Sequence, residues 1–211
     1  MTNKQLIVIS SGTGPQSGKS TLKDWLLMNV EGDRGTATSF ALPLKQLVLH
    51  FLQMWFPHAD VHLLSRMLGG DLKEAQLEGL PAGVTPRRLM QTLGTEWREL
   101  VDKDLWVKMM LGRLTTELVE GKTNNVIIDD LRFRHELTAL RDWCEENGVK
   151  LWHIRVYRAS NNYVPNHASE TAVFDAHEVD LHLYNDGTKE EFLEKLPERM
   201  RGIGLELRNG V

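Results

Sequence analysis

The sequence predicts an α/β fold with a mainly parallel sheet, because short apolar runs alternate with longer stretches of helical periodicity. Polar or loop residues follow each apolar run, which is the pattern of buried parallel strands. The 211 residues suffice for one sizeable core, so we expect a single domain, residues 1–211, with insertions. The five predicted strands are Gln5–Ser10, Thr36–Phe40, Asn125–Asp129, Lys150–Tyr157 and Asp180–Tyr184.

Helix start and stop signals mark five predicted helices between and after these strands. Pro43 favours the start of the second helix, and Gly121 and Gly148 lie just beyond the ends of the third and fourth. Thr188, after the turn-like Asn185-Asp186-Gly187, is suited to cap the last helix. The predicted helices are Lys19–Met28, Leu44–Trp55, Lys103–Glu120, Phe133–Glu146 and Lys189–Arg201.

Two segments interrupt the alternation of strands and helices. Residues 57–102 contain several glycines and prolines, and we expect them to form a helical insertion between the second and third strands. Residues 159–178 form a second irregular stretch, between the fourth and fifth strands, which we expect to be a lid-like loop. Loops carried by a rigid sheet are where binding and catalytic residues concentrate, so both segments are candidates for substrate contacts.

The composition limits the classes of partner. The formal net charge is −4, which gives no general attraction to nucleic acid or membrane but leaves room for a local basic groove. Cys144 is the single cysteine, so an intrachain disulfide is ruled out. The apolar runs are too short to cross a bilayer or to act as a signal segment. We therefore expect a cytoplasmic protein with no membrane partner.

The strongest single motif is residues 12–21, Gly-Thr-Gly-Pro-Gln-Ser-Gly-Lys-Ser-Thr, between the first strand and the first helix. Glycines allow backbone N–H groups to turn toward phosphate oxygens, and the helix N-terminus adds positive potential. Lys19 is suited to reach the β- and γ-phosphates of ATP, and the Ser20 hydroxyl is suited to bind Mg²⁺. The predicted nucleotide-binding residues here are Gly14, Ser17, Gly18, Lys19, Ser20 and Thr21. An ordinary glycine turn before a helix is the structural alternative.

The motif departs from the usual phosphate-binding pattern at one position. The pattern G-x-x-x-x-G-K-[ST] places glycine at residue 13, where this chain has Thr13 between Gly12 and Gly14. Either Thr13 adopts the backbone conformation of the first glycine or the loop is slightly rearranged.

The third predicted strand ends in two carboxylates, Asp129 and Asp130. A carboxylate at this edge of a parallel sheet suits Mg²⁺ and its waters, because Mg²⁺ prefers hard oxygen ligands. We assign Asp129 to the metal and Asp130 to catalysis. The alternative is that both aspartates cap the following helix.

Reading on from this strand end, Asp130-Leu131-Arg132-Phe133-Arg134-His135-Glu136 resembles a segment of the bacteriophage deoxynucleoside monophosphate kinases. In that family an Asp-Val-Arg-Phe-x-x-Glu-like stretch follows the third core strand. Four other stretches resemble the family in the same order: Ser39–Lys45, Arg88–Arg98, His167–Glu170 and Asn185–Thr188. The resemblance thus covers most of the chain. It departs from the family pattern at Thr13, at Leu131 and at Arg134-His135.

The resemblance implies roles for several residues. Arg132, just past the acidic strand end, is then a catalytic residue that neutralises charge on the transferring phosphate. Arg158 is implied as a lid-type contact to ATP. The implied substrate-binding residues are Lys45, Arg88, Gln91, Arg98 and Glu170. The alternatives are a surface salt bridge from Arg132 to Glu136, a solvated helix face for Arg88, Gln91 and Arg98, and a helix cap for Glu170.

Together these features predict a three-layer P-loop NTPase fold of the nucleoside monophosphate kinase type. The implied reaction moves the γ-phosphoryl group of ATP, with Mg²⁺, to a deoxynucleoside monophosphate. Three alternatives stay open: a kinase of hydroxymethylated pyrimidines within phage DNA, a non-enzymatic nucleotide-binding switch, and a phosphotransferase acting on a small metabolite. The late arginines favour a kinase over a switch. The expected partners are small-molecule nucleotides, in the host cytoplasm if the chain is of phage origin, and a homodimer stays open.

Overall fold

The computed structural model describes residues 4–14, 16–32, 35–159 and 174–210. The chain forms two compact units, which we describe separately. Met1–Ser39 and Met110–Val211 form the sheet unit, and Phe40–Met109 form the helical unit. The predicted insertion, residues 57–102, lies within the helical unit, which begins earlier and ends later in the sequence. That the chain works as a single kinase domain stays a prediction.

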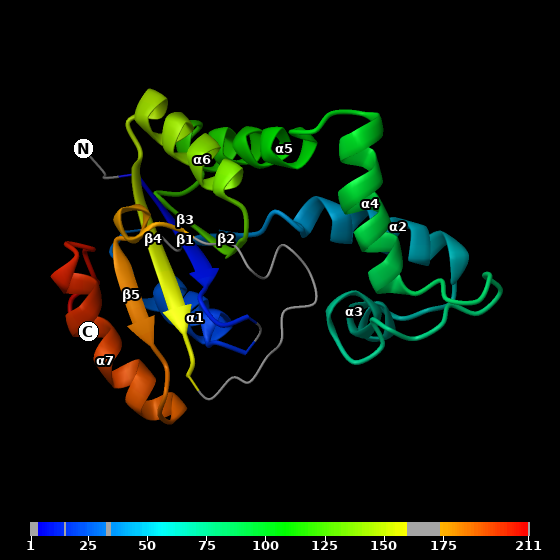
Figure 1. Cartoon of the computed structure of the whole chain (residues 1–211), viewed down its shortest axis with the longest axis horizontal. Coiled ribbons are helices and arrows are strands. Elements are labelled where there is room, and N and C mark those ends of the chain that lie inside the picture. The colour runs from blue at the N-terminus through cyan, green and yellow to red at the C-terminus, as the bar shows by residue number, and fades with distance from the viewer. Residues whose placement is uncertain (1–3, 15, 33–34, 160–173, 211) are drawn as a thin grey trace. The chain divides into compact units, whose positions relative to one another are not determined.

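The sheet unit is built on a five-stranded parallel sheet with the strand order β2-β3-β1-β4-β5, as Figure 1 shows. This arrangement confirms the predicted α/β fold. The strands are β1 (Gln5–Ser11), β2 (Thr36–Thr38), β3 (Asn125–Leu131), β4 (Lys150–Tyr157) and β5 (Leu181–Tyr184). β1 lies at the centre of the sheet, so the residues that follow it emerge in the middle of the carboxyl edge, where ligands of such sheets bind.

Helices cover both faces of this sheet (Figure 1). α1 (Lys19–Asn29) and α7 (Lys189–Gly202) pack on one face, where Leu22, Leu26, Phe192 and Leu196 join alternate strand residues in one buried cluster. α6 (Arg134–Asn147) lies on the other face, because the connections β1 to β2 and β3 to β4 cross the sheet in opposite directions and both are expected to be right-handed. The result is the predicted three-layer arrangement.

Several predicted boundaries were wrong. β2 ends at Thr38 because Phe40 turns into the next helix, and β5 begins one residue late because the Asp180 carboxylate accepts the His153 backbone N–H (2.7 Å). β3 continues to Leu131, which pairs with Ser10. The predicted helix 103–120 is an α-helix only over Leu105–Leu114 (α5) and then widens into a π-helical turn, Thr115–Val119 (η1). A 3-10 turn, Ala176–Glu178 (η3), precedes β5.

The helical unit has a core of its own. It contains α2 (Leu42–Trp55), α3 (Val61–Gly69), α4 (Pro86–Leu100) and the start of α5. Val48, Leu52, Leu64 and Leu77 are buried together at its centre. The Asp60 and Thr85 side chains cap α3 and α4 by accepting backbone N–H groups. No helix in the described parts of the chain is long and apolar enough to cross a membrane.

Candidate active site

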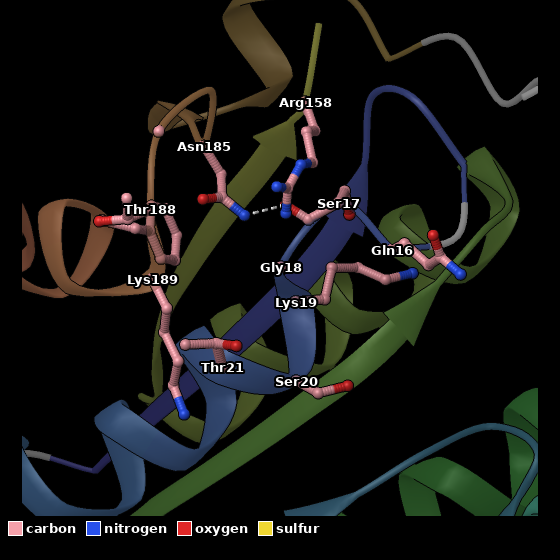
Figure 2. Close-up of a pocket in the computed structure, with 12 residues that line it drawn as sticks. Gln16, Ser17, Gly18, Lys19, Ser20, Thr21, Arg158, Asn185, Thr188 and Lys189 are labelled. Atoms are coloured by element: carbon pink, nitrogen blue, oxygen red, sulfur yellow. Dashed lines mark hydrogen bonds between the residues drawn. The ribbon is translucent and has the colours of Figure 1, made fainter. Parts of the chain in front are cut away.

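The residues that follow β1 form a cradle that opens on a cavity of about 450 Å³ (Figure 2). The loop between β1 and α1 provides one wall, and the turn between β5 and α7 provides the other. Twelve residues line the cavity: Gln16, Ser17, Gly18, Lys19, Ser20, Thr21, Arg158, Asn185, Gly187, Thr188, Lys189 and Phe192. The structure thus brings together most of the residues predicted to bind the nucleotide, including Arg158 from the end of β4.

The backbone of the loop has the shape that binds anions. Gly14 (φ +83°), Gln16 (φ +62°) and Gly18 (φ +107°) adopt left-handed conformations, interleaved with other residues. Left-handed residues of this kind turn backbone N–H groups toward one concave side, at the N-terminus of α1. The Ser11 hydroxyl donates to the Gly14 carbonyl (2.5 Å) and also contacts the Ser17 hydroxyl (3.1 Å), which fixes this shape from inside.

The Thr13 side chain forms a hydrogen bond that a glycine at this position could not form. The positive φ values that favour glycine fall at Gly14 and Gly18 and not at Thr13. The Thr13 hydroxyl accepts the backbone N–H of Arg158 (2.9 Å). This hydrogen bond joins the phosphate loop to the end of β4. Gly12, the residue before, lies against the Tyr157 ring, where an added Cβ would come within 2.2 Å of the ring carbons.

Lys19 lies among the predicted catalytic charges. Burial lowers its pKa from the ordinary value, the Arg132 guanidinium lowers it further, and the carboxylates of Asp130 and, more weakly, Asp129 raise it. The strand end that carries these carboxylates is irregular: β3 uses one more residue than β1 between the pairs Val8–Ile128 and Ser10–Leu131. A bulge of this kind redirects side chains and is common next to active sites. Lys19, Asp129, Asp130 and Arg132 therefore form one electrostatic cluster.

The two aspartates differ in their partners. Asp129 forms an ion pair with Lys23 of α1 (3.2 Å), one helical turn after Lys19. Asp130 acts more strongly on the Lys19 ammonium. Sequence reasoning missed Lys23, although its spacing of four residues from Lys19 places both on one face of the helix.

Glu136 holds the turn that presents Arg132. Its carboxylate is buried and accepts the backbone N–H groups of Arg132 (2.9 Å) and Phe133 (3.0 Å). These contacts are to the backbone. Burial raises the pKa of Glu136 to about 7, against the effect of the two N–H donors and of the Arg132 guanidinium, the sequence alternative's salt-bridge partner of Glu136, which also acts electrostatically on this carboxyl. Spacing would have found this residue, because an acidic side chain three positions into a helix commonly closes a capping box.

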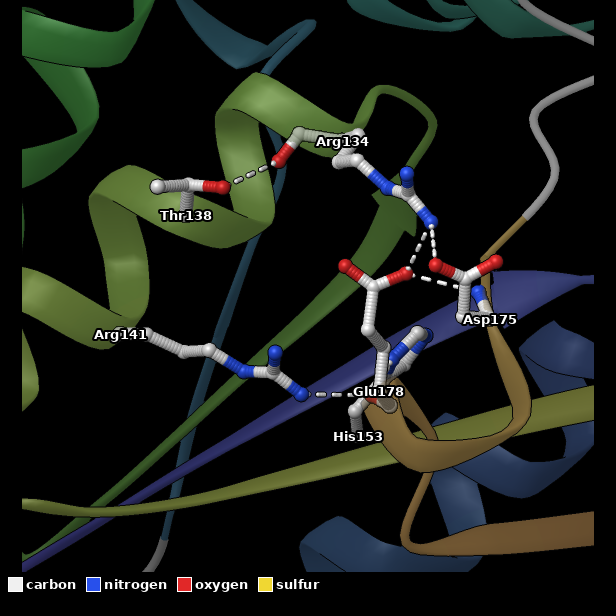
Figure 3. A network of polar contacts seen from close by, with 6 residues as sticks. All are labelled: Arg134, Thr138, Arg141, His153, Asp175 and Glu178. Atoms are coloured by element: carbon white, nitrogen blue, oxygen red, sulfur yellow. Dashed lines mark hydrogen bonds and ion pairs between the residues drawn. The ribbon is translucent and has the colours of Figure 1, made fainter.

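A second polar network joins α6 to the segment before β5 (Figure 3). Arg134 pairs with Asp175 (2.5 Å) and Glu178 (2.7 Å). Buried His153 on β4 contacts the Glu178 carbonyl through Nδ1 (2.7 Å) and the Ser10 hydroxyl through Nε2 (2.8 Å). Burial lowers the pKa of His153 to about 4, so the ring is neutral near pH 7, with its proton on Nδ1 and Nε2 accepting from Ser10. The network anchors residues 174–178 and supplies no reactive group.

Four of the five residues predicted to bind the acceptor lie in the helical unit, namely Lys45, Arg88, Gln91 and Arg98. Arg88, Gln91, Thr95 and Arg98 follow one another at spacings of three and four residues, so they lie along one side of α4. Arg98 also lines an open hollow of about 590 Å³ with Thr95, Glu99, Val101, Asp102 and Lys103. Lys45 is an exposed residue of α2. These residues belong to a different compact unit from Lys19 and Arg132.

Two tryptophans, Trp97 and Trp106, stack on each other in the helical unit. Trp106 is buried, donates its indole N–H to the Gly94 carbonyl (3.3 Å) and stacks with Trp97 at a ring separation of 6.3 Å. Trp106 therefore packs in the core, whereas Trp97 is 40% exposed. Pro15 of the phosphate loop, the family-like stretch His167–Glu170 with the predicted contact Glu170, and most of the predicted loop 159–178 lie outside the described residues.

The parallel sheet, the phosphate loop with its lysine, and the acidic strand end followed by an arginine define the class of protein as a P-loop kinase. A family model described as deoxynucleotide monophosphate kinase matches residues 82–196, more than half of the chain. The chain belongs to this family, which confirms the resemblance seen in its motifs. No curated protein matches the chain.

Solved structures of three proteins are similar to the whole chain at low identity. The Mycobacterium tuberculosis APS kinase CysC in complex with AMPPNP and APS is 10% identical, with a TM-score of 0.46 over 95% of this chain and 99% of that one. A putative kinase from Chloroflexus aurantiacus is 12% identical, with a TM-score of 0.42 over 96% and 98% of the two chains. A tunicamycin resistance protein from Deinococcus radiodurans is 12% identical, with a TM-score of 0.40 over the same shares. Similarities of this size have no bearing on the substrate.

Proposed function

We propose that this deoxynucleotide monophosphate kinase transfers the γ-phosphoryl group of ATP, bound with Mg²⁺, to a free deoxynucleoside monophosphate. The observation that carries the proposal is the cluster of Lys19, Asp129, Asp130 and Arg132 beside a phosphate loop, in a chain of this family. The products are ADP and a deoxynucleoside diphosphate.

On the ATP side, backbone N–H groups do much of the binding. The left-handed residues Gly14, Gln16 and Gly18 and the N-terminus of α1 provide donors for the β- and γ-phosphates. Lys19 adds a cation whose pKa is lowered chiefly by burial. A bound triphosphate favours the charged form of this lysine and so offsets that burial. Arg158, which lines the cavity, contacts the nucleotide from the end of β4 in this proposal.

The oxygen groups near Lys19 suit Mg²⁺. The Ser20 hydroxyl at the start of α1 and the carboxylates of Asp129 and Asp130 are hard oxygen donors of the kind that Mg²⁺ prefers, and these groups would hold the ion. Because Asp129 is already paired with Lys23, we propose that Asp130 is the carboxylate that matters more for the rate. The ion supplies neutralisation of the phosphate charge when bound.

The acceptor needs no strong general base, because its phosphate already carries an anionic oxygen. That oxygen forms a new bond to the γ-phosphorus while the bond to the β,γ-bridging oxygen breaks and ADP leaves with the electron pair. The chain contributes positioning and positive charge, with Lys19 and Arg132 stabilising charge on the transferring group.

The acceptor side belongs to the helical unit in this proposal. The row of Arg88, Gln91 and Arg98 on α4 offers two guanidinium groups for a phosphate and an amide for a base edge. Lys45 and Glu170 are proposed as additional contacts. Cytoplasmic location, phage origin and a homodimer remain predictions.

The test is an ATP-dependent assay across the common deoxynucleoside and ribonucleoside monophosphates, with Lys19→Ala as the control. The proposal expects a diphosphate product from at least one deoxynucleotide, formed in equal amount with ADP and absent with the control variant. Release of inorganic phosphate with every acceptor, and of no diphosphate, would contradict it.

A further inference from the structure

The turn after β5 reaches back to the phosphate loop through one buried side chain. Asn185 is 6% exposed and donates its side-chain N–H to the Ser17 carbonyl (2.9 Å), as the dashed line in Figure 2 shows. Its own backbone N–H donates to the Tyr157 carbonyl (2.8 Å), one residue before Arg158. Asn185 thus joins the phosphate loop to the ends of β4 and β5, although it lies 168 residues from Ser17 in the sequence.

The contact fixes the orientation of one peptide group. In a planar trans peptide the C=O and the following N–H point in opposite directions. A hydrogen bond that holds the Ser17 carbonyl on the Asn185 side therefore directs the Gly18 N–H to the other side. Ser17 is itself buried, at 1% exposed, so this peptide has little freedom to rotate.

The fit between Asn185 and the next residue is tight. Gly18 has φ +107°, and a Cβ at this position would lie 2.4 Å from the Asn185 side-chain nitrogen. The asparagine amide fills the space that a side chain at position 18 would occupy. A rotation of the Ser17–Gly18 peptide therefore requires either the loss of the Asn185 hydrogen bond or movement of the turn after β5.

We propose that Asn185 is a positioning residue for phosphoryl transfer, which sets the Ser17–Gly18 peptide in the orientation that binds ATP phosphates. The inference rests on the proposed function, because it assumes that the loop binds ATP. Asn185 acts through the loop backbone, and its effect should therefore fall on ATP and on the rate rather than on the acceptor.

The test compares Asn185→Asp and Asn185→Ala with Asn29→Asp. Asn29 is a matched control, since its half-buried amide also donates to a backbone carbonyl, that of Trp25 (2.7 Å), in a turn of α1 away from the cavity. We expect kcat/KM for ATP to fall about 10- to 100-fold in both Asn185 variants, with a smaller ATP-induced rise in Tm. KM for the deoxynucleotide should stay within about twofold of wild type. Asn29→Asp should lose stability and keep its kinetic constants.

The outcomes separate the two proposals. A wild-type protein whose Tm does not respond to ATP would refute the proposed function itself. A wild-type response together with unchanged kcat and KM for ATP in the Asn185 variants would overturn the inference alone, even where their Tm is lower. Should Asn185→Asp fail to fold, Asn185→Ala, which introduces no charge, decides by the same readout.

Discussion

The sheet unit and the helical unit hold their candidate residues in different ways. In the sheet unit the phosphate loop is fixed from several directions, by Thr13, by Asn185 and by the Ser11 hydroxyl. In the helical unit the candidate residues are side chains along one face of a single helix, α4. In the proposed function, ATP binding therefore depends mainly on the conformation of the loop backbone. Binding of the acceptor depends on individual side chains.

This difference predicts which kinetic constant each substitution changes. Groups that act on the transferring phosphate should lower kcat, and groups that only bind the acceptor should raise its KM.

The largest effect is expected for Lys19→Ala. Removing the Lys19 cation, which lies among Asp129, Asp130 and Arg132, should lower kcat/KM by about 10³-fold. The fold should be kept, because Lys19 is proposed to contact the ATP phosphates. Kinetics at saturating acceptor and the Tm with and without ATP check this. A variant with near wild-type kcat/KM would remove the phosphate-loop assignment.

The next effect separates the two aspartates. Asp130→Asn should lower kcat by about 10²-fold with little loss of nucleotide binding, because the lost charge matters most while charge moves between phosphates. Asp129→Asn breaks the ion pair with Lys23 and should have the smaller effect on rate. Steady-state kinetics with ATP-induced Tm shifts separates rate from binding. Wild-type activity in both variants would contradict the metal-binding and catalytic roles of the pair.

The two arginines test the contrast between the units. Arg132→Ala should lower kcat, since Arg132 belongs to the charge cluster around Lys19. Arg98→Ala should raise the acceptor KM by roughly 5- to 20-fold and leave kcat nearly unchanged, as expected for loss of one charge-assisted contact. Titrations of each substrate at saturating levels of the other measure both constants. Wild-type kinetics in both would contradict the phosphate roles.

The smallest effect is expected at Thr13. Thr13→Val keeps the shape of the side chain but removes the hydroxyl that accepts the Arg158 backbone N–H. We expect kcat/KM for ATP to fall about fivefold, the loss typical of one neutral hydrogen bond. Thr13→Ser, which keeps the hydroxyl, should be close to wild type. Thr13→Gly restores the usual pattern and should nevertheless behave like Thr13→Val. Higher activity in Thr13→Gly would show that the hydroxyl contact is unimportant.

The sequence predicted the parts of the site whose chemistry is local. Residues 12–21 lie between a strand and a helix, and Asp129, Asp130 and Arg132 follow one another at a strand end, so short spacing sufficed. The supports of these residues come from far along the chain. Neither the Thr13–Arg158 nor the Asn185–Ser17 hydrogen bond leaves a periodic trace, because each depends on how the strand ends meet at the edge of the sheet.

The predicted ends of the helix 103–120 and of the third strand were wrong, because residue type suggested one boundary and backbone hydrogen bonding set another. The apolar periodicity over residues 103–120 predicted one helix, but the turn Thr115–Val119 is π-helical, with the Thr115 hydroxyl donating to the Leu111 carbonyl (3.0 Å). Polar Asp129 and Asp130 suggested that the third strand had ended, whereas pairing with β1 continues to Leu131 through the bulge.

The central claim is tested most directly by incubating the protein with labelled ATP and two kinds of acceptor in separate tubes. One tube contains free deoxynucleoside monophosphates, and the other contains duplex DNA carrying hydroxymethylated pyrimidines. The net charge of −4 is unlike that of a protein that follows a DNA backbone with a basic stripe. We therefore expect the label to appear in a deoxynucleoside diphosphate and not in DNA. Label found only in the DNA would contradict the mononucleotide assignment.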